Sequence, residues 1–200
     1  MTDSPIRLSP SGPIIGKANS FGPGARLRLT EATSVMGGSQ SIPSTPDVIS
    51  PDGFSTTNPL VLTLDAPKEK LNYRASLSLD VINTSTNEGG EVVLYLDVSL
   101  DGGTTFTNRA KNVHVINSTE PDESDAQVEG RSMQVWLPLT LGSALGISDA
   151  TPPASIKLRA RANRVVGSSA LLVSSRDTSG GSDPVSGLNG TIHMELEECL

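Results

Sequence analysis

The sequence predicts an all-β protein built as a two-sheet antiparallel sandwich, most simply a jelly roll, with an extended N-terminal arm. Apolar and polar side chains alternate over several segments, which is the two-residue period of a strand with one buried face. The chain has 19 glycines, 14 prolines and only 3% aromatic residues, a composition typical of many strands joined by turns. No segment shows the period of an amphipathic helix.

The clearest strand signal lies between Leu71 and Leu100. Every second residue from Leu71 to Val81 is apolar or aromatic, and residues 94–100 repeat this pattern. The connection at 83–90 reads Asn-Thr-Ser-Thr-Asn-Glu-Gly-Gly, which is rich in turn-forming residues. We therefore expect two long strands that form an antiparallel pair joined by this loop.

Further strands follow at short intervals, and Asp101-Gly102-Gly103 predicts a hairpin turn because glycine accepts positive φ. Segment 165–174 is a candidate to return beside 156–162. In 131–141 every second residue from Met133 onward is apolar, and the side chains expected to point inward are Met133, Val135, Leu137, Leu139 and Leu141. The other expected strands are 60–64, 104–108, 111–117, 156–162 and 189–197. No internal repeat occurs, which excludes a propeller or solenoid. The side chains expected to meet in one interior include Leu77, Leu96, Val135 and Ile192.

Residues 1–56 are expected to lie outside the sandwich domain, which would span 57–200. Prolines are scattered through this segment and interrupt both helices and central strands. Only 25–30 alternates like a strand. Apolar residues such as Ile14, Phe21 and Val48 are too frequent for a pure linker. We favour an extended arm, lying on the domain or on a neighbouring copy, over a flexible tail.

The formal net charge of −7 opposes nucleic acid or an anionic membrane as the main partner, because both attract a basic surface. The single cysteine, Cys199, excludes an intrachain disulfide. The start resembles no secretion signal, and no apolar stretch is long enough to span a bilayer. We expect a protein made in the cytoplasm.

No residues form a recognisable catalytic pattern, so we expect no enzyme activity and no cofactor. His114 and His193 fall on the polar parity of their strands and are interpreted as surface histidines. Carboxylates at close spacing, of the kind that calcium prefers, occur in the loop Glu120, Asp122, Glu123 and Asp125. This loop lacks the pattern of a calcium-binding loop, as do Asp177 and Asp183. We interpret both loops as solvated, with no metal site.

The basic residues Lys157, Arg159 and Arg161 share one face of a predicted strand. One interpretation is an edge strand charged to prevent sheet-to-sheet aggregation. The other is a contact with an acidic surface on another subunit or particle protein. The sequence favours neither.

The apolar or aromatic residues Val93, Tyr95 and Trp136 interrupt the polar parity of their strands. Single exposed apolar residues are ordinary on protein surfaces. If the three converge, they form a patch suited to a subunit interface, because Tyr and Trp supply large contact areas. We favour the interface.

The succession of strands resembles the jelly rolls of tumour-necrosis-factor-like and complement-globular-head-like domains. Similar domains occur as trimeric decoration, fibre and minor capsid proteins of viruses and tailed phages. The likeness covers roughly residues 57–198, although this chain has few aromatics where the animal versions pack their trimer axes, and we expect no leader peptide. The segments that carry it are 71–79, 92–103, 133–141, 156–162 and 190–196.

This resemblance implies a structural virion protein that acts by subunit contacts, as a trimer, and binds the major capsid protein or other virion proteins. The alternative is a carbohydrate-binding or host-adhesion module of a viral fibre or cell surface. Sandwiches often present ligand loops at one end, and the loops 83–90, 118–130 and 174–187 are candidates. None of these loops contains an aromatic residue to stack on a sugar ring.

Overall fold

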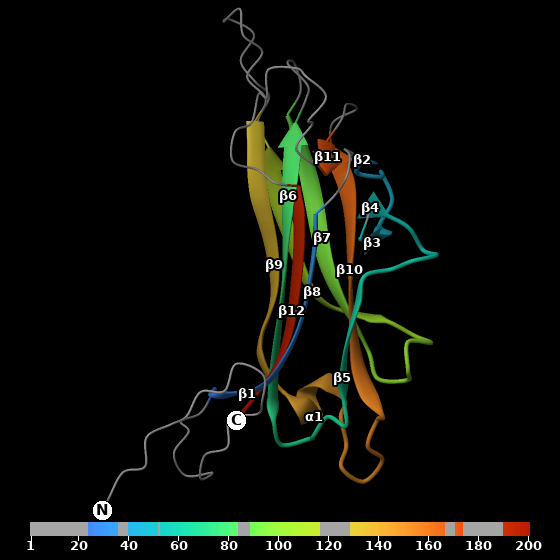
Figure 1. Ribbon diagram of the computed structural model, residues 1–200, viewed down its shortest axis with the longest axis vertical. Helices are drawn as coiled ribbons and strands as arrows, with labels where there is room; N and C mark the ends of the chain where they lie inside the picture. The colour runs from blue at the N-terminus through green and yellow to red at the C-terminus, as the bar shows by residue number, and fades with distance from the viewer. Residues whose placement is uncertain are drawn as a thin grey trace, which may run out of the picture.

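In the computed structural model, the protein is a sandwich of two antiparallel β-sheets packed face to face (Figure 1). The structure describes residues 24–35, 40–51, 53–83, 89–116, 129–166, 171–173 and 190–200. The all-β antiparallel sandwich expected from the sequence is confirmed. The connectivity of a jelly roll stays a prediction.

The first sheet, sheet A, is organised around β6 (Asn72–Asn83). Strand β9 (Glu129–Leu141) pairs along one side of β6. On the other side, β12 (Thr191–Cys199) pairs with the first part of β6 and β11 (Leu171–Val173) with its end. The outer strands are β1 (Arg26–Val35), beside β12, and β2 (Gln40–Ser41), beside β11.

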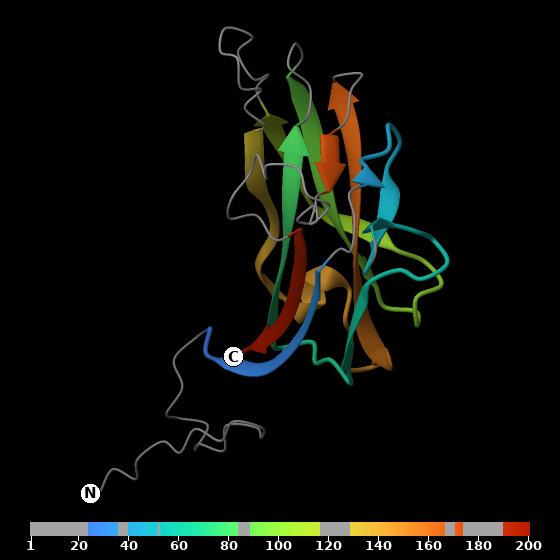
Figure 2. The ribbon, with the colours of Figure 1, turned by 45° about the horizontal axis from the view of Figure 1, so that its top comes forward.

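The second sheet, sheet B, is organised around β10 (Ser155–Val166). One side of β10 pairs with β7 (Gly90–Ser99), and β8 (Thr107–Ile116) forms the outer edge beyond β7. The other side pairs with β5 (Val61–Asp65) and β3 (Asp47–Ser50), and β3 pairs in turn with β4 (Gly53–Phe54). A single helical turn, α1 (Gly142–Leu145), links β9 to the β10 side of the sandwich (Figure 2).

The core lies between the two sheets and is filled by the apolar parity of the strands. Leu77, Leu96, Val135 and Ile192 all belong to one buried cluster, as expected. Each is at most 1% exposed. Alternation therefore predicted correctly the core-facing residues of β6, β7 and β12, and those of β9 as far as Leu137.

The expected pairing between the strands at 71–81 and 91–100 is wrong. Strand β6 lies in sheet A and β7 in sheet B, so the connection between them crosses from one sheet to the other. Segment 165–174 also does not return beside β10, because β11 pairs with β6. Alternation reports the buried face of a strand, and it contains no information about the strand's neighbour.

The N-terminal segment pairs with both sheets as far as the structure describes it. Strand β1 pairs with β12 over its whole length, and β3 pairs with β10. The backbone of Gly24 donates to the carbonyl of Leu200 at 2.8 Å, which joins the start of this strand to the C-terminus. Strands β1 to β4 therefore add to the two sheets, so the described part of this segment lies on the domain, which is one of the two positions expected for the arm. Residues 1–23 lie outside the described part of the chain.

Strand β9 departs from simple alternation at Pro138. Tyr73 of β6 is opposite Thr140 and Ala75 is opposite Leu137, so Pro138 and Leu139 of β9 lie opposite a single residue of β6, Arg74. This is a β-bulge, and proline suits it because it has no N–H to donate. The bulge reverses the parity, and Leu139 and Leu141, expected inside, are 48% and 43% exposed.

Candidate functional site

The outer face of sheet A carries a line of side chains that crosses four strands. Glu31 of β1 is opposite Glu195 of β12, and Glu195 is opposite Ser76 of β6. Ser76 is in turn opposite Trp136 of β9. The neighbouring residues on these strands point into the core, so this line faces outward. It runs from a pair of carboxylates to an indole ring.

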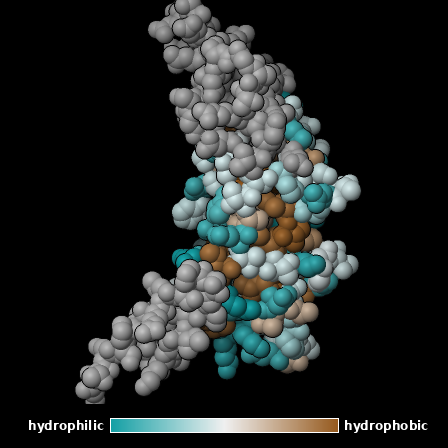
Figure 3. Space-filling view, in the orientation of Figure 1, coloured by the Kyte–Doolittle hydropathy of each residue, from teal (hydrophilic) through white to brown (hydrophobic). Residues whose placement is uncertain are grey.

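Trp136 begins an exposed apolar stretch along the edge strand β9. Its side chain is 65% exposed, and its Nε1 donates to Gln134 Oε1 at 3.2 Å. Because of the bulge, Leu139 and Leu141 follow on the same outer face. We call Trp136, Pro138, Leu139 and Leu141 the β9 strip. Figure 3 views the molecule from the side of sheet A, where brown hydrophobic areas interrupt a largely pale and teal surface. Exposed apolar stretches of this kind are typical of contact surfaces.

A shallow groove of about 380 Å³ runs beside Trp136 on this face. One wall is apolar and includes the indole, Pro138 and Leu139. The opposite wall is polar and is formed by Arg74, Ser76, Glu195 and Glu197. In such a groove, the indole can stack on the flat apolar face of a ligand ring. The carboxylates and the guanidinium can form hydrogen bonds with hydroxyl groups at the rim of that ring.

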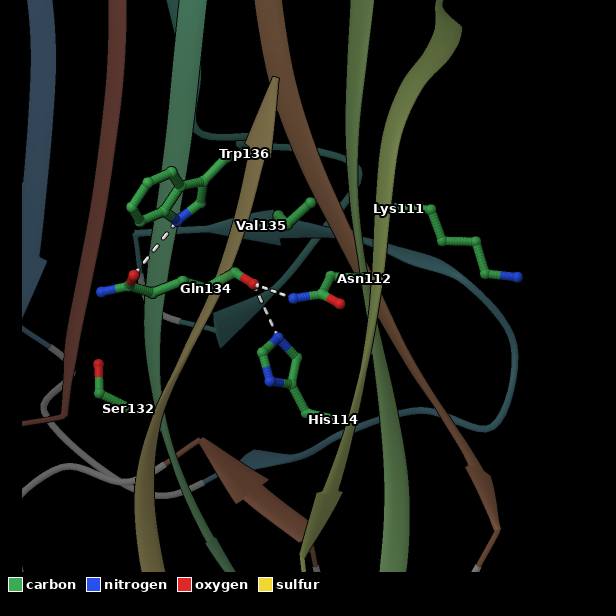
Figure 4. Close-up of a pocket in the computed structure, with 7 residues that line it drawn as sticks. All are labelled: Lys111, Asn112, His114, Ser132, Gln134, Val135 and Trp136. Atoms are coloured by element: carbon green, nitrogen blue, oxygen red, sulfur yellow. Dashed lines mark hydrogen bonds between the residues drawn. The ribbon is translucent and has the colours of Figure 1, made fainter. Parts of the chain in front are cut away.

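A second hollow, of about 470 Å³, lies on the open side of the sandwich between β8 and β9 (Figure 4). Asn112 Nδ2 donates to the backbone carbonyl of Gln134 at 2.9 Å, and His114 Nε2 donates to the same oxygen at 2.7 Å. Side chains from the edge of sheet B therefore satisfy a backbone acceptor on the edge of sheet A. This arrangement blocks that acceptor from an added strand. Val113, between these two residues, is 48% exposed as a result.

On the outer face of sheet B, charged side chains surround one carboxylate and bury it. Asp97 has 0% exposure and accepts hydrogen bonds from Arg161 Nε at 2.5 Å and from Arg159 Nε at 3.3 Å. Asn108 Nδ2 donates to it at 3.2 Å. Burial by itself would raise the pKa of Asp97, but the hydrogen bonds from Arg161 and Asn108 and the charges of both arginines outweigh burial. The pKa therefore lies below its usual value.

The same arginines also lie over aromatic rings. The guanidinium carbon of Arg159 is 4.0 Å from the centre of the Phe106 ring, and that of Arg161 is 5.0 Å from the centre of the Tyr95 ring. Lys157, the third basic residue singled out in the sequence, makes no ion pair with any residue the structure describes. Two of the three cations are thus paired within the molecule and are less available to a partner.

The structure does not bring Val93, Tyr95 and Trp136 together. Tyr95 and Trp136 lie on different sheets, in β7 and β9. Val93 is 3% exposed, so the expectation that it contributes to an exposed patch is wrong. Trp136 instead has Leu139 and Leu141 as its apolar neighbours along β9. The sequence contained the signal for these two leucines only in Pro138, whose bulge reverses the alternation.

A carboxylate network near the C-terminus was not expected from the sequence. Glu198 is 3% exposed and accepts from Arg28 Nε at 2.6 Å and from the Tyr73 hydroxyl at 3.0 Å. Burial, together with the neighbouring carboxylate, raises the pKa of Tyr73 to about 12. Glu197 is also buried and pairs with Arg26 and Arg74. These ion pairs fasten β1 and β6 to β12 and so hold the outer face of sheet A in place.

Among the described residues, a hydroxyl, an imidazole and a carboxylate lie in hydrogen-bonding order only at His193, on the outer face of sheet A, where neither the hydroxyl nor the imidazole lines either of the hollows described above. His114 bonds a backbone carbonyl, and His193 lies between Thr33 and Glu195. The acidic loop at 120–125 and the aspartates at 177 and 183 lie outside the described residues. Of the described side chains, Glu31, His193 and Glu195 form a group with metal-binding atoms within 4.8 Å of one another.

No helix in the described part of the chain is long and apolar enough to cross a membrane. No known protein family matches the sequence, and no curated protein matches it either. Among solved structures, the chain has a distant likeness to an aminopeptidase from the marine sediment archaeon Thaumarchaeota archaeon, with 10% sequence identity and a TM-score of 0.28. The likeness covers 88% of this chain but only 32% of the aminopeptidase. A TM-score this low supports no statement about fold or activity.

Proposed function

We propose that this chain is a non-enzymatic structural subunit of a virus or phage particle, a decoration or minor capsid protein. It acts by binding copies of itself, as a trimer, and by binding the major capsid protein or other particle proteins. The placement in a particle is supported by the resemblance of the strand succession to such proteins. The mode of action is supported by one observation, the exposed β9 strip on the edge of sheet A.

The β9 strip suits association better than the basic residues of sheet B do. Burying apolar surface contributes roughly 25 cal/mol per Å², and tryptophan is among the residues that contribute most at interfaces. Arg159 and Arg161 are already paired with Asp97, so a partner's acidic group would have to compete with a buried carboxylate. Apolar contact at Trp136 therefore drives assembly in this proposal, and charge has a smaller part.

Light scattering coupled to size-exclusion chromatography tests the proposal. The wild-type chain is expected to elute as a trimer, and Trp136→Ser to shift it toward monomer. Val113→Ser is the matched control, because Val113 is also exposed but belongs to β8 of sheet B. A chain that stays monomeric at every concentration and does not co-sediment with particles would overturn the proposal.

A second candidate function, binding of carbohydrate, is favoured by the groove beside Trp136. The groove combines an indole with the polar side chains of Arg74, Ser76 and Glu195, which a sugar-binding site requires. This candidate places the ligand on the face of sheet A and not on the end loops. Saturable binding on a glycan array that is abolished by Trp136→Ala and retained by Val113→Ser would support it. An array without any saturable signal would leave assembly as the function.

A further inference from the structure

Three metal-binding side chains converge on the outer face of sheet A, at the β1 side of the line that ends in Trp136. His193 and Glu195 are two residues apart on β12, so both point outward. Glu31 of β1 is directly opposite Glu195. One candidate ligand atom from each of the three lies within 4.8 Å of the others. Two adjacent strands thus supply one imidazole and two carboxylates to a single point.

The imidazole is already oriented for such a role. His193 Nδ1 is 2.7 Å from Thr33 Oγ1, and His193 Nε2 is 3.1 Å from Glu195 Oε1. In the metal-free protein Nε2 donates to Glu195, because a carboxylate oxygen only accepts, and Nδ1 accepts from the Thr33 hydroxyl. A metal ion would replace the proton on Nε2, and Nδ1 would then carry the proton and donate it to Thr33 Oγ1. Histidine ligands in metal sites are held by a hydrogen bond of this kind from the second ring nitrogen.

Glu195 accepts hydrogen bonds from His193 Nε2 and Ser76 Oγ, but the charge of Glu31 is not balanced by any described residue. Two carboxylates directly opposite each other in a sheet repel, and Glu31 makes no ion pair with any described residue. The nearby arginines do not supply the missing charge, because Arg26 and Arg74 both pair with Glu197. A divalent cation between Glu31 and Glu195 would remove this repulsion.

We propose that Glu31, His193 and Glu195 bind a divalent first-row transition metal, with zinc as the representative ion. The nitrogen ligand disfavours calcium and magnesium, which prefer oxygen. Zinc bonds nitrogen and oxygen ligands at about 2.0–2.2 Å, so its ligands stand roughly 3.3 Å apart. His193 and Glu195 already have this separation, and Glu31 is exposed and can rotate toward them. A water molecule is the fourth ligand of the zinc ion. This site shares Glu195 with the groove beside Trp136 but has no residue in common with the β9 strip.

Isothermal titration of the full chain with zinc chloride tests the site. One zinc ion per chain is expected, with affinity lowered at least about ten-fold by His193→Ala and by Glu31→Gln. His114→Ala is the matched control, because the chain has only two histidines, and it should bind zinc like the wild type. Cys199→Ser should also bind normally, because Cys199 has 0% exposure.

A stability measurement without metal separates a zinc site from an ordinary polar surface. Glu31→Gln removes the repulsion, so it should raise the melting temperature of the metal-free protein while it weakens zinc binding. Thr33→Val should also weaken zinc binding, because it frees the imidazole to turn. The proposal is overturned if zinc does not bind, if His193→Ala binds zinc like the wild type, or if His114→Ala abolishes the binding.

Discussion

The two outer faces of the sandwich carry charged strands of similar composition but treat their charges differently. On sheet B, a buried carboxylate lies between two arginines, and aromatic rings cover the guanidinium groups. On sheet A, two carboxylates are opposite each other, and an indole stands exposed at the edge. The face of sheet A also has a paired carboxylate, Glu197, but it leaves Glu31 without an ion pair among the described residues and Trp136 exposed. We therefore assign stability to the face of sheet B and interaction to the face of sheet A.

Breaking the Asp97 cluster should give the largest effect. Arg161→Met leaves a fully buried carboxylate with only part of its compensation, and we expect a loss of about 3 kcal/mol in the free energy of unfolding. Urea unfolding followed by circular dichroism measures it. Lys157→Met on the same strand should change stability by less than about 0.5 kcal/mol, because Lys157 has no ion pair among the described residues. Equal effects of the two variants would contradict the assignment.

The same cluster predicts a pH dependence. The pKa of Asp97 is lower in the folded state than in the unfolded state, because Arg161 and Asn108 stabilise its charged form against the effect of burial. Its contribution to stability is thus complete above the unfolded pKa of about 3.9 and is lost as the pH falls through the lower folded pKa. Asp97→Asn should therefore lose less stability than the wild type on acidification below about pH 4. Parallel acid-unfolding curves for the two proteins would be the contradictory result.

The face of sheet A should respond in the opposite way, with little change in stability and a large change in association. Trp136→Ser removes a side chain that is 65% exposed, so the free energy of unfolding should change by less than about 0.5 kcal/mol. Self-association should weaken by about ten-fold or more, because a buried tryptophan is a typical main contributor to an interface. Sedimentation equilibrium measures the association. A strong loss of stability with unchanged association would assign Trp136 to the fold.

The smallest effect is expected at the carboxylate pair. Without metal, Glu31→Gln removes repulsion from Glu195 and should raise the free energy of unfolding by a few tenths of a kcal/mol, roughly the size of a cross-strand pair. Thermal unfolding in a chelating buffer measures this change. Glu91→Gln on β7 is a matched control, because the residues opposite Glu91 in register are valines, and it should not stabilise. A destabilising effect of Glu31→Gln would show that the pair is already compensated.

Alternation in the sequence was sufficient to predict the core-facing residues of β6, β7, β10 and β12, because burial in a sandwich has a period of two. It did not predict that Val93, Asp97 and Glu197, on the polar parity, are also buried. It could not predict that β6 and β7 lie in different sheets, because either sheet offers the same buried face. The reversal at Leu139 and Leu141 depends on a bulge, and proline permits a bulge without requiring one.

The candidate sites also depend on strand pairing, which alternation does not predict. The outward position of Arg159, Arg161 and Trp136 followed from parity. That Asp97 lies between the two arginines depends on the pairing of β7 with β10, which the sequence does not contain. Glu31 and His193 are far apart in the chain and meet only because β1 adds to β12. The alternation at 25–30 predicted a strand there, but it contained no information about the strand with which β1 pairs.

The fluorescence of Trp136, the single tryptophan of the chain, tests most directly whether the face of sheet A is the interaction face. The emission and the acrylamide quenching of the indole should be followed while protein concentration is raised through the range in which oligomers form. If this face is covered on assembly, the emission will shift to shorter wavelength and quenching will fall in step with oligomer formation. Oligomers that form while Trp136 keeps the emission and quenching of a solvated indole would contradict the account.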